Sequence, residues 1–251
     1  MLESFKRLFT RQGVERDLTD ISAWAQSRGF GFKRARGESG FVIDGAFEGR
    51  PWRAEWGAPQ RDYIVNHELR LRMELDLPSD LQMLLLSRPL MDSLERKTFE
   101  EFTDNVQTQI GTNTPEEMRW LVMFPKVNLS ELKALRVNFG AVASLPALGL
   151  AWLTGPLEEA LALAATGLLH HAPPFVLMTL RGRAYLRMQL WSPDAKDVGA
   201  ALALFEVAVT RALVISGGAM AQRAADWDSG ANTAWQSLRP DGPPPELQKR
   251  R

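Results

Sequence analysis

Between His67 and Leu77 the chain alternates strictly between apolar and charged side chains, and this pattern limits the possible folds more than any other. Leucine or methionine stands at every second position from residue 69, with glutamate, arginine or aspartate between them. Successive side chains of a β-strand point to opposite faces of a sheet, so the pattern predicts a half-buried strand. The fold must therefore supply apolar cover for one face of a sheet.

A β-hairpin is predicted just before this strand. Residues 41–47 and 50–56 flank Glu48-Gly49, a two-residue connection with glycine where a positive φ is needed. Pairing residue 47 with residue 50 fixes the register of the hairpin. This register sets Phe41 opposite Trp56, Ile43 opposite Ala54 and Gly45 opposite Trp52 on an apolar face, and Asp44 opposite Arg53 on a polar face.

The remaining elements are predicted from periodicity and from helix start and stop signals. A second hairpin is expected around Arg181-Gly182, with strands over residues 175–180 and 183–190. A further strand is expected over residues 135–141, with a helix that runs on from Asn128 as the alternative. Helices are expected over residues 17–28, 79–85, 89–110, 115–124, 155–169 and 193–215, with Pro89 as the interruption between the second and the third.

The five-residue segments 71–75 and 186–190 match at four positions, and each precedes a Pro, Ser or Asp helix start. One explanation is a hairpin-then-helix unit that occurs twice. The favoured explanation is that the period of two restricts which residues an amphipathic strand can use.

Together these segments predict an α+β protein in which antiparallel sheets carry helices packed on one side. We expect an N-terminal α+β unit over residues 1–111 and a helix-richer α+β unit over residues 112–218. The composition then shifts to Gly, Ala, Asp, Ser and Pro, which predicts a polar C-terminal tail over residues 219–251.

Charge and cysteine content exclude several classes of protein. Thirty basic and thirty acidic side chains give a formal net charge of zero, without the concentrated basic face that nucleic-acid binding needs. The absence of cysteine removes thiol nucleophiles, cysteine-ligated zinc and disulfides together. We therefore expect no nucleic-acid partner.

The start of the chain shows no secretory signal pattern, so we expect a cytoplasmic location. Residues 2–11 carry apolar side chains at helical spacing, which favours a helix packed on its own domain over a membrane-surface helix. Residues 137–157 lack charge but are broken by proline and glycine, so we expect core elements and no transmembrane segment. The preference for arginine over lysine is typical of a bacterial source.

Cofactor and catalytic motifs are not found. Gly29-Phe30-Gly31 lacks the third glycine of a dinucleotide fingerprint, and Asp226-Trp227-Asp228 begins like a calcium loop without continuing as one. The pairs Glu116-Glu117 and Glu158-Glu159 are explained by first helical turns, where the helix dipole and the capping box favour acidic residues. We therefore expect no cofactor, no metal and no catalytic residue.

Only three histidines are available for imidazole chemistry. His170 and His171 precede Ala172-Pro173-Pro174 and are interpreted as helix C-terminal residues, although they are the candidate polar site if the protein is an enzyme. Adjacent side chains diverge on a helix or a strand, so these two are not expected to face one metal ion. His67 begins the alternating strand and is interpreted as a partly buried polar group.

Eight tryptophans are more notable than the histidines. Six fall in or beside predicted elements and are expected in the core. Trp227 and Trp235 lie in the polar C-terminal region, where each leaves a large apolar ring to bury. They are expected either to fold back on the parent domain, which is the favoured alternative, or to anchor a partner.

Three hypotheses of function follow, in order of preference. The first is a non-catalytic binding or scaffold protein that holds another protein through an exposed sheet face or through Trp227 and Trp235. The second is a carrier of an apolar small molecule, held between the sheet and the helices over residues 156–169 and 193–215. The third is a hydrolase that uses His170 or His171 with a carboxylate brought in by the fold.

Overall fold

The computed structural model describes residues 18–35, 40–104 and 114–236, with side chains described in 18–35, 40–100 and 114–221. The helix expected at residues 2–11 lies outside these ranges. The chain divides into two compact units, residues 1–215 and 216–251.

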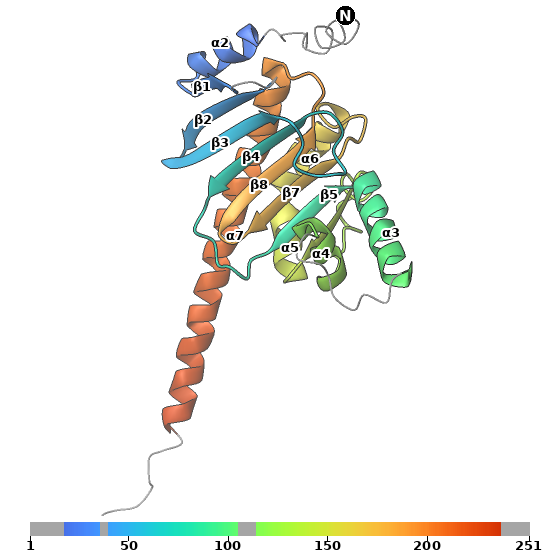
Figure 1. Ribbon diagram of the computed structural model, residues 1–251. Helices are drawn as coiled ribbons and strands as arrows, with labels where there is room; N and C mark the ends of the chain where they lie inside the picture. The colour runs from blue at the N-terminus through green and yellow to red at the C-terminus, as the bar shows by residue number, and fades with distance from the viewer. Residues whose placement is uncertain (1–17, 36–39, 105–113, 237–251) are drawn as a thin grey trace, which may run out of the picture. The chain divides into compact units, whose positions relative to one another are not determined.

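One eight-stranded antiparallel sheet forms the centre of the first unit, in the order β1-β2-β3-β4-β8-β7-β5-β6 (Figure 1). Strands from both sides of residue 111 join this sheet. The predicted class, α+β with helices packed on an antiparallel sheet, is confirmed. The strands are β1 (Gly31–Arg34), β2 (Phe41–Phe47), β3 (Arg50–Gly57), β4 (Glu68–Glu74), β5 (Met83–Ser87), β6 (Phe139–Ala143), β7 (Phe175–Leu180) and β8 (Arg183–Gln189).

Both predicted hairpins are present. In the first, the predicted register is confirmed at every pair, including Phe41 with Trp56 and Asp44 with Arg53. Both connections have positive φ at their two central residues, which is the turn geometry that matches the twist of paired strands. These turn residues are Glu48, Gly49, Arg181 and Gly182.

The similar segments 71–75 and 186–190 lie largely in β4 and β8, which are neighbours in the sheet with Leu71 opposite Leu186. A duplicated hairpin-then-helix unit is not confirmed.

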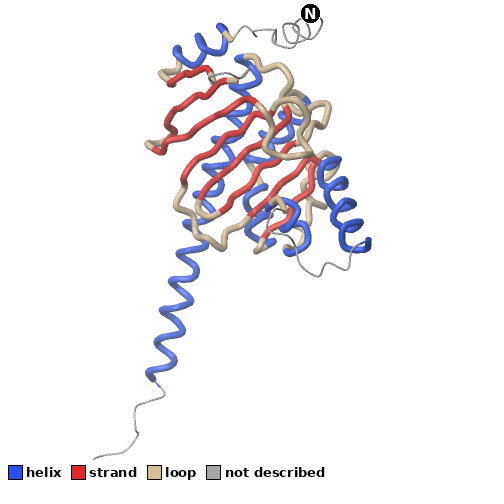
Figure 2. Tube along the Cα trace, viewed as in Figure 1, coloured by secondary structure: helices blue, strands red, loops and turns tan. Residues whose placement is uncertain are grey.

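Helices cover one whole face of the sheet, which we call the inner face (Figure 2). This layer consists of α2, α5, α6 and the part of α7 up to Ile215. Its core contains fully buried side chains from sheet and helices, among them Leu71, Leu186, Leu161 and Phe205. The helices are α2 (Thr19–Ser27), α3 (Arg88–Asp104), α4 (Glu116–Met123), α5 (Pro146–Leu153), α6 (Pro156–Thr166) and α7 (Ala195–Gln236).

The opposite, outer face is covered only at one end, where α3 and α4 pack over β5, β6 and β7 (Figure 1). This smaller core joins both helices to the outward side chains of the three strands. Its buried members include Leu84, Leu86, Leu90, Met118, Trp120, Val142, Val176 and Met178. Over β2, β3, β4 and β8, no helix of the described part of the chain covers the outer face.

Three segments differ from the sequence prediction. Residues 83–87 form strand β5 and not a helix, because both faces of this strand are buried and the alternation that marks a half-buried strand is missing. The next helix begins at Arg88, with Pro89 in its first turn, where no backbone N–H is required. The strand expected over 135–141 is shifted to Phe139–Ala143, because residues 133–138 form turns. Helix α5 is an element that the sequence analysis does not predict.

Helix α7 begins where predicted, with Asp194 Oδ1 accepting a hydrogen bond from the backbone N–H of Asp197 at 2.6 Å. It continues to Gln236, so the predicted end near Ile215 is wrong. Gly217 and Gly218 suggest a helix end, but each costs a helix only about 1 kcal/mol relative to alanine. Residues 219–236 of the predicted tail are therefore helical, and residues 237–251 lie outside the described part.

Within the described residues, the segment Ala195–Ala221 of α7 is long and apolar enough to cross a membrane, and it contains an 18-residue window with a mean hydropathy of 2.0. Half of this window is nevertheless buried inside the protein. Val198, Ala201, Phe205 and Val209 are among its residues in the main core, so packing on the sheet accounts for their apolar character.

Candidate functional site

The uncovered part of the outer face carries most of the charged side chains of the sheet, and we call it the open face. Each of its strands directs apolar residues to the inner core and polar residues outward, as the alternation between residues 67 and 77 predicts for β4. The members of the open face are Val42, Asp44, Arg53, Glu55, Glu68, Arg70, Arg72, Glu74, Arg183, Tyr185 and Arg187.

Glu68 is the fully buried centre of the open face. Its carboxylate accepts hydrogen bonds from Arg187 Nη1 at 2.7 Å, from Arg70 Nη1 at 3.2 Å and from the backbone N–H of Gln60 at 2.7 Å. Arg70 and Arg187 stand directly opposite each other on β4 and β8, and like charges in such positions repel. The shared carboxylate compensates this repulsion and fixes both guanidinium groups.

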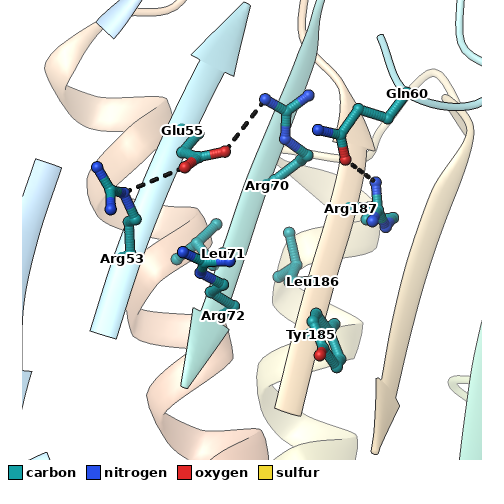
Figure 3. A pocket seen from close by; sticks show the side chains of 9 residues that line it. All are labelled: Arg53, Glu55, Gln60, Arg70, Leu71, Arg72, Tyr185, Leu186 and Arg187. Atoms are coloured by element: carbon teal, nitrogen blue, oxygen red, sulfur yellow. Dashed lines mark hydrogen bonds and ion pairs between the residues drawn. The ribbon is translucent and has the colours of Figure 1, made fainter. Parts of the chain in front are cut away.

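Glu55 extends the network toward the edge of the sheet, as the dashed lines in Figure 3 show. One carboxylate oxygen accepts a hydrogen bond from Arg70 Nη2 at 3.2 Å, and the other lies 3.1 Å from Arg53 Nε. Arg53 also lies 3.5 Å from Asp44 Oδ1, its predicted cross-strand neighbour. Charges of alternating sign thus run across β2, β3, β4 and β8.

A hollow of about 400 Å³, partly open to solvent, lies between these side chains. Arg72 differs from the other arginines around it, because within the described residues it has no ion-pair or hydrogen-bond partner. It stands between Arg53 on β3 and Tyr185 on β8. The hollow is lined by Arg53, Glu55, Gln60, Arg70, Leu71, Arg72, Tyr185, Leu186 and Arg187.

A second buried carboxylate, that of Glu117 on α4, lies beside the open face. Glu117 accepts a hydrogen bond from Tyr63 Oη at 3.0 Å, and Arg61 Nε lies 3.2 Å and 3.3 Å from its two oxygens. Burial, and then the negative charge of Glu117, raise the pKa of Tyr63 far above its ordinary value. Because Gln60 and Arg61 belong to the β3–β4 loop, Glu68 and Glu117 together hold this loop in place.

Glu117 lies in the first turn of α4, as predicted, but its assignment to a capping box is wrong. Helix α4 has no side-chain cap, and the Glu117 carboxylate is used by Arg61 and Tyr63. The partners are 54 to 56 residues away in the chain, so no local spacing could reveal them.

His170 and His171 lie in the turn that follows α6, with ring centroids 3.4 Å apart. The expectation that the two side chains diverge is wrong, because it holds for a helix or a strand and not for this turn. Neither ring has an ion-pair or hydrogen-bond partner within the described residues. Across those same residues, no group of three or more His, Asp or Glu side chains could hold a metal ion. His67, which is half-buried, stacks on Trp56 with ring centroids 4.4 Å apart.

Trp227 and Trp235 are positions of the second unit, within the helical part that ends at Gln236. Their side chains lie outside the described set. Their roles as a partner anchor or as part of the fold stay predictions.

Comparisons with known proteins do not assign the chain to a family. No protein-family model matches the chain, and no curated protein matches it in sequence. Among solved structures, the chain is similar to the mycobacterial trehalose monomycolate transport factor A, with a TM-score of 0.46 and 7% identity. The similarity covers 80% of this chain and 95% of that one. A likeness of this size concerns the course of the backbone and says nothing about ligand or partner.

Proposed function

We propose that this protein is a non-catalytic binding protein that holds another protein on its open face. The observation that carries the proposal is the fixed network in which Glu68 and Glu55 hold Arg53, Arg70 and Arg187. These groups stand on β-strands, where their positions are set before a partner arrives. Little side-chain entropy is then lost on binding, which favours affinity and specificity.

Two observations favour this proposal over the alternatives. A hydrolase would need a carboxylate beside His170 or His171, whereas the described contact of these rings is with each other. An apolar carrier would need space between the inner face and α6 or α7. That space is filled by side chains such as Leu157, Phe205 and Val209, which are fully buried.

The test is site-specific photo-crosslinking in the native cell. A benzophenone amino acid replaces Arg183, an exposed member of the open face, and in a matched control it replaces Arg96, an exposed arginine of α3. We expect a protein adduct from position 183 that is absent from position 96. The purified adduct partner should then bind the unlabelled protein and lose affinity for Arg183→Glu. Equal labelling from both positions, or none from position 183, contradicts the proposal.

A second candidate interface is the helical second unit, and the observation that favours it is the continuation of α7 to Gln236. This helical segment contains Trp227 and Trp235, and tryptophan is one of the residue types that most often dominate interface energies. Truncation before Ala221 separates the alternatives. Unchanged stability with loss of the partner supports an anchor, a lower unfolding midpoint supports a part of the fold, and no change in either eliminates both.

A further inference from the structure

We propose that Arg72, with Arg53 and Tyr185 beside it, forms a carboxylate-binding subsite that takes an acidic side chain from an extended segment of the partner protein. This inference rests on the proposed function of the open face and names the chemistry of the partner.

Among the described residues, the ion pairs of the open face leave one arginine without a partner. Every acidic side chain there already has an arginine partner. Glu68 is shared by Arg70 and Arg187, and Glu55 by Arg53 and Arg70. Glu74 accepts a hydrogen bond from Arg183 Nε at 2.7 Å, and Asp44 lies beside Arg53. Arg72 is the arginine of this face whose charge no described carboxylate compensates.

The position of Arg72 in the sheet favours the binding of an anion. It stands directly opposite Arg53, so two like charges are neighbours across β3 and β4. Such a pair is unfavourable, and an anion placed between the two would relieve the repulsion. The planar guanidinium of Arg72 has all its N–H donors free among the described residues, and it matches a carboxylate with two parallel hydrogen bonds.

Tyr185 supplies the other side of the subsite. It stands opposite Arg72 on β8, and its partly buried side chain lines the hollow beside Arg72. The phenol hydroxyl carries an O–H donor, so Tyr185 can donate a hydrogen bond to an anion at Arg72. A carboxylate at Arg72 could therefore accept from both side chains.

The shape of the surface around the subsite favours an extended segment over a small anion. A second hollow, of about 480 Å³, adjoins the first, because Arg53 and Arg72 line both of them. Its other residues include Asp44, Glu74 and Arg183. The subsite thus lies between two neighbouring hollows that are lined by further charged groups.

The acidic residues around the subsite also exclude a uniformly charged polymer. A nucleic acid places a phosphate at about every 3.4 Å of each strand, so some phosphates would meet Glu55, Glu74 or Asp44. An extended peptide places its side chains on one face about 7 Å apart, and it can present an acid at Arg72 and a neutral residue elsewhere. The alternating charges of the open face therefore select a peptide with spaced acidic residues.

The experiment measures binding of a seven-residue peptide with one central glutamate among alanines, compared with its glutamine counterpart, by isothermal titration calorimetry on the full chain. We expect the glutamate peptide to bind and the glutamine peptide not to. Arg72→Ala should weaken binding by about tenfold or more, the effect of losing a charge-assisted hydrogen bond. The affinity of Arg72→Lys for the glutamate peptide should fall between those of the parent and Arg72→Ala, because lysine keeps the charge and loses the planar guanidinium. Arg96→Ala on α3 is the matched control and should bind as the parent does.

Unchanged affinity in Arg72→Ala, with an unchanged urea midpoint to show that the variant is folded, overturns the subsite. Inorganic phosphate that binds as tightly as the glutamate peptide overturns the choice of a peptide. Failure of the subsite can be distinguished from failure of the proposed function. If a partner crosslinks at position 183 and its affinity for Arg72→Ala equals its affinity for the parent, the open face is still an interface and only the subsite is removed.

Discussion

Arg72 and Met178 occupy the same level and the same face of one sheet, two strands apart, with Tyr185 between them. Arg72 is exposed on the open face, whereas Met178 is 3% exposed in the core that also contains Met118 and Trp120. The backbone pairing is antiparallel at both positions. The two positions differ in what covers them, because α3 and α4 pack over β5, β6 and β7 and not over β4.

Tyr185 and Tyr63 lie at the boundary between these two regions. Both are partly buried and pack against the smaller core, and the Tyr63 hydroxyl donates a hydrogen bond to Glu117 at 3.0 Å. An aromatic body with a polar tip suits such a boundary. The charged character of the open face is therefore determined by where the cover of α3 and α4 ends. Exchanging residue types across this boundary tests that conclusion.

The largest effect is expected from Met178→Arg. A charge without a partner in the smaller core loses its hydration, at an effective cost of several kcal/mol. Total stability of a folded domain is about 5–15 kcal/mol, so this variant should be close to unfolding. Urea unfolding followed by tryptophan fluorescence measures the loss. Met178→Leu, which changes shape but not polarity, should cost less than about 1.5 kcal/mol. A midpoint for Met178→Arg equal to that of the parent would show that this end of the face is open.

The next largest effect is expected from Glu117→Ala. Removing a fully buried carboxylate leaves Arg61 partly buried without its counter-charge, and breaking such a pair costs about 3–5 kcal/mol. The matched control is Glu116→Ala, the preceding residue of the same helix. Glu116 pairs with Arg119 and Arg181 near the surface, where an ion pair contributes about 1 kcal/mol or less. Equal losses in the two variants would show that Glu117 is an ordinary surface group.

Local signals in the sequence predict the hairpins but not the buried network. The register of β2 and β3 follows from Glu48-Gly49, because a two-residue turn fixes every pair that follows it. Strand β5 is missed for a physical reason: Leu84 and Leu86 face one core and Met83 and Leu85 the other, so no period of two is visible.

The candidate site depends on contacts that are distant in the sequence. The polar character of β4 and the neighbours Asp44 and Arg53 are predictable from alternation and register. The neighbour of Arg72 on β8 is Tyr185 and not a carboxylate that could pair with it. This arrangement requires β4 and β8 to pair across more than 100 residues. The pairing of Glu117 with Arg61 likewise depends on α4 lying over the β3–β4 loop. No single-sequence pattern encodes either contact.

A smaller, pH-dependent effect is expected from Tyr63→Phe. Near neutral pH the variant loses a hydrogen bond to a buried carboxylate, at a cost of about 1.5–3 kcal/mol. The pKa of Tyr63 is raised in the folded protein by burial and by Glu117, whereas in the unfolded chain it is about 10. The unfolded phenol therefore ionises first, and the stability that Tyr63 contributes is present below pH of about 10 and falls as the pH rises above it. The difference in unfolding free energy between parent and Tyr63→Phe should shrink above that pH, and a difference that grows there would contradict the assignment.

The smallest effect on stability is expected from Arg72→Met, which places the residue type of the covered end on the open face. Arg72 is exposed and has no described partner, so its removal should change the unfolding free energy by no more than about 0.5 kcal/mol. At low salt the variant should have the higher unfolding free energy, because the repulsion between Arg72 and Arg53 is removed. This gain should vanish at about 0.5 M salt, where surface charges are screened. Urea midpoints at the two salt concentrations measure both quantities. A loss above about 1 kcal/mol would mean that Arg72 supports the fold as Met178 does, and the two ends of the face would then differ in residue type alone.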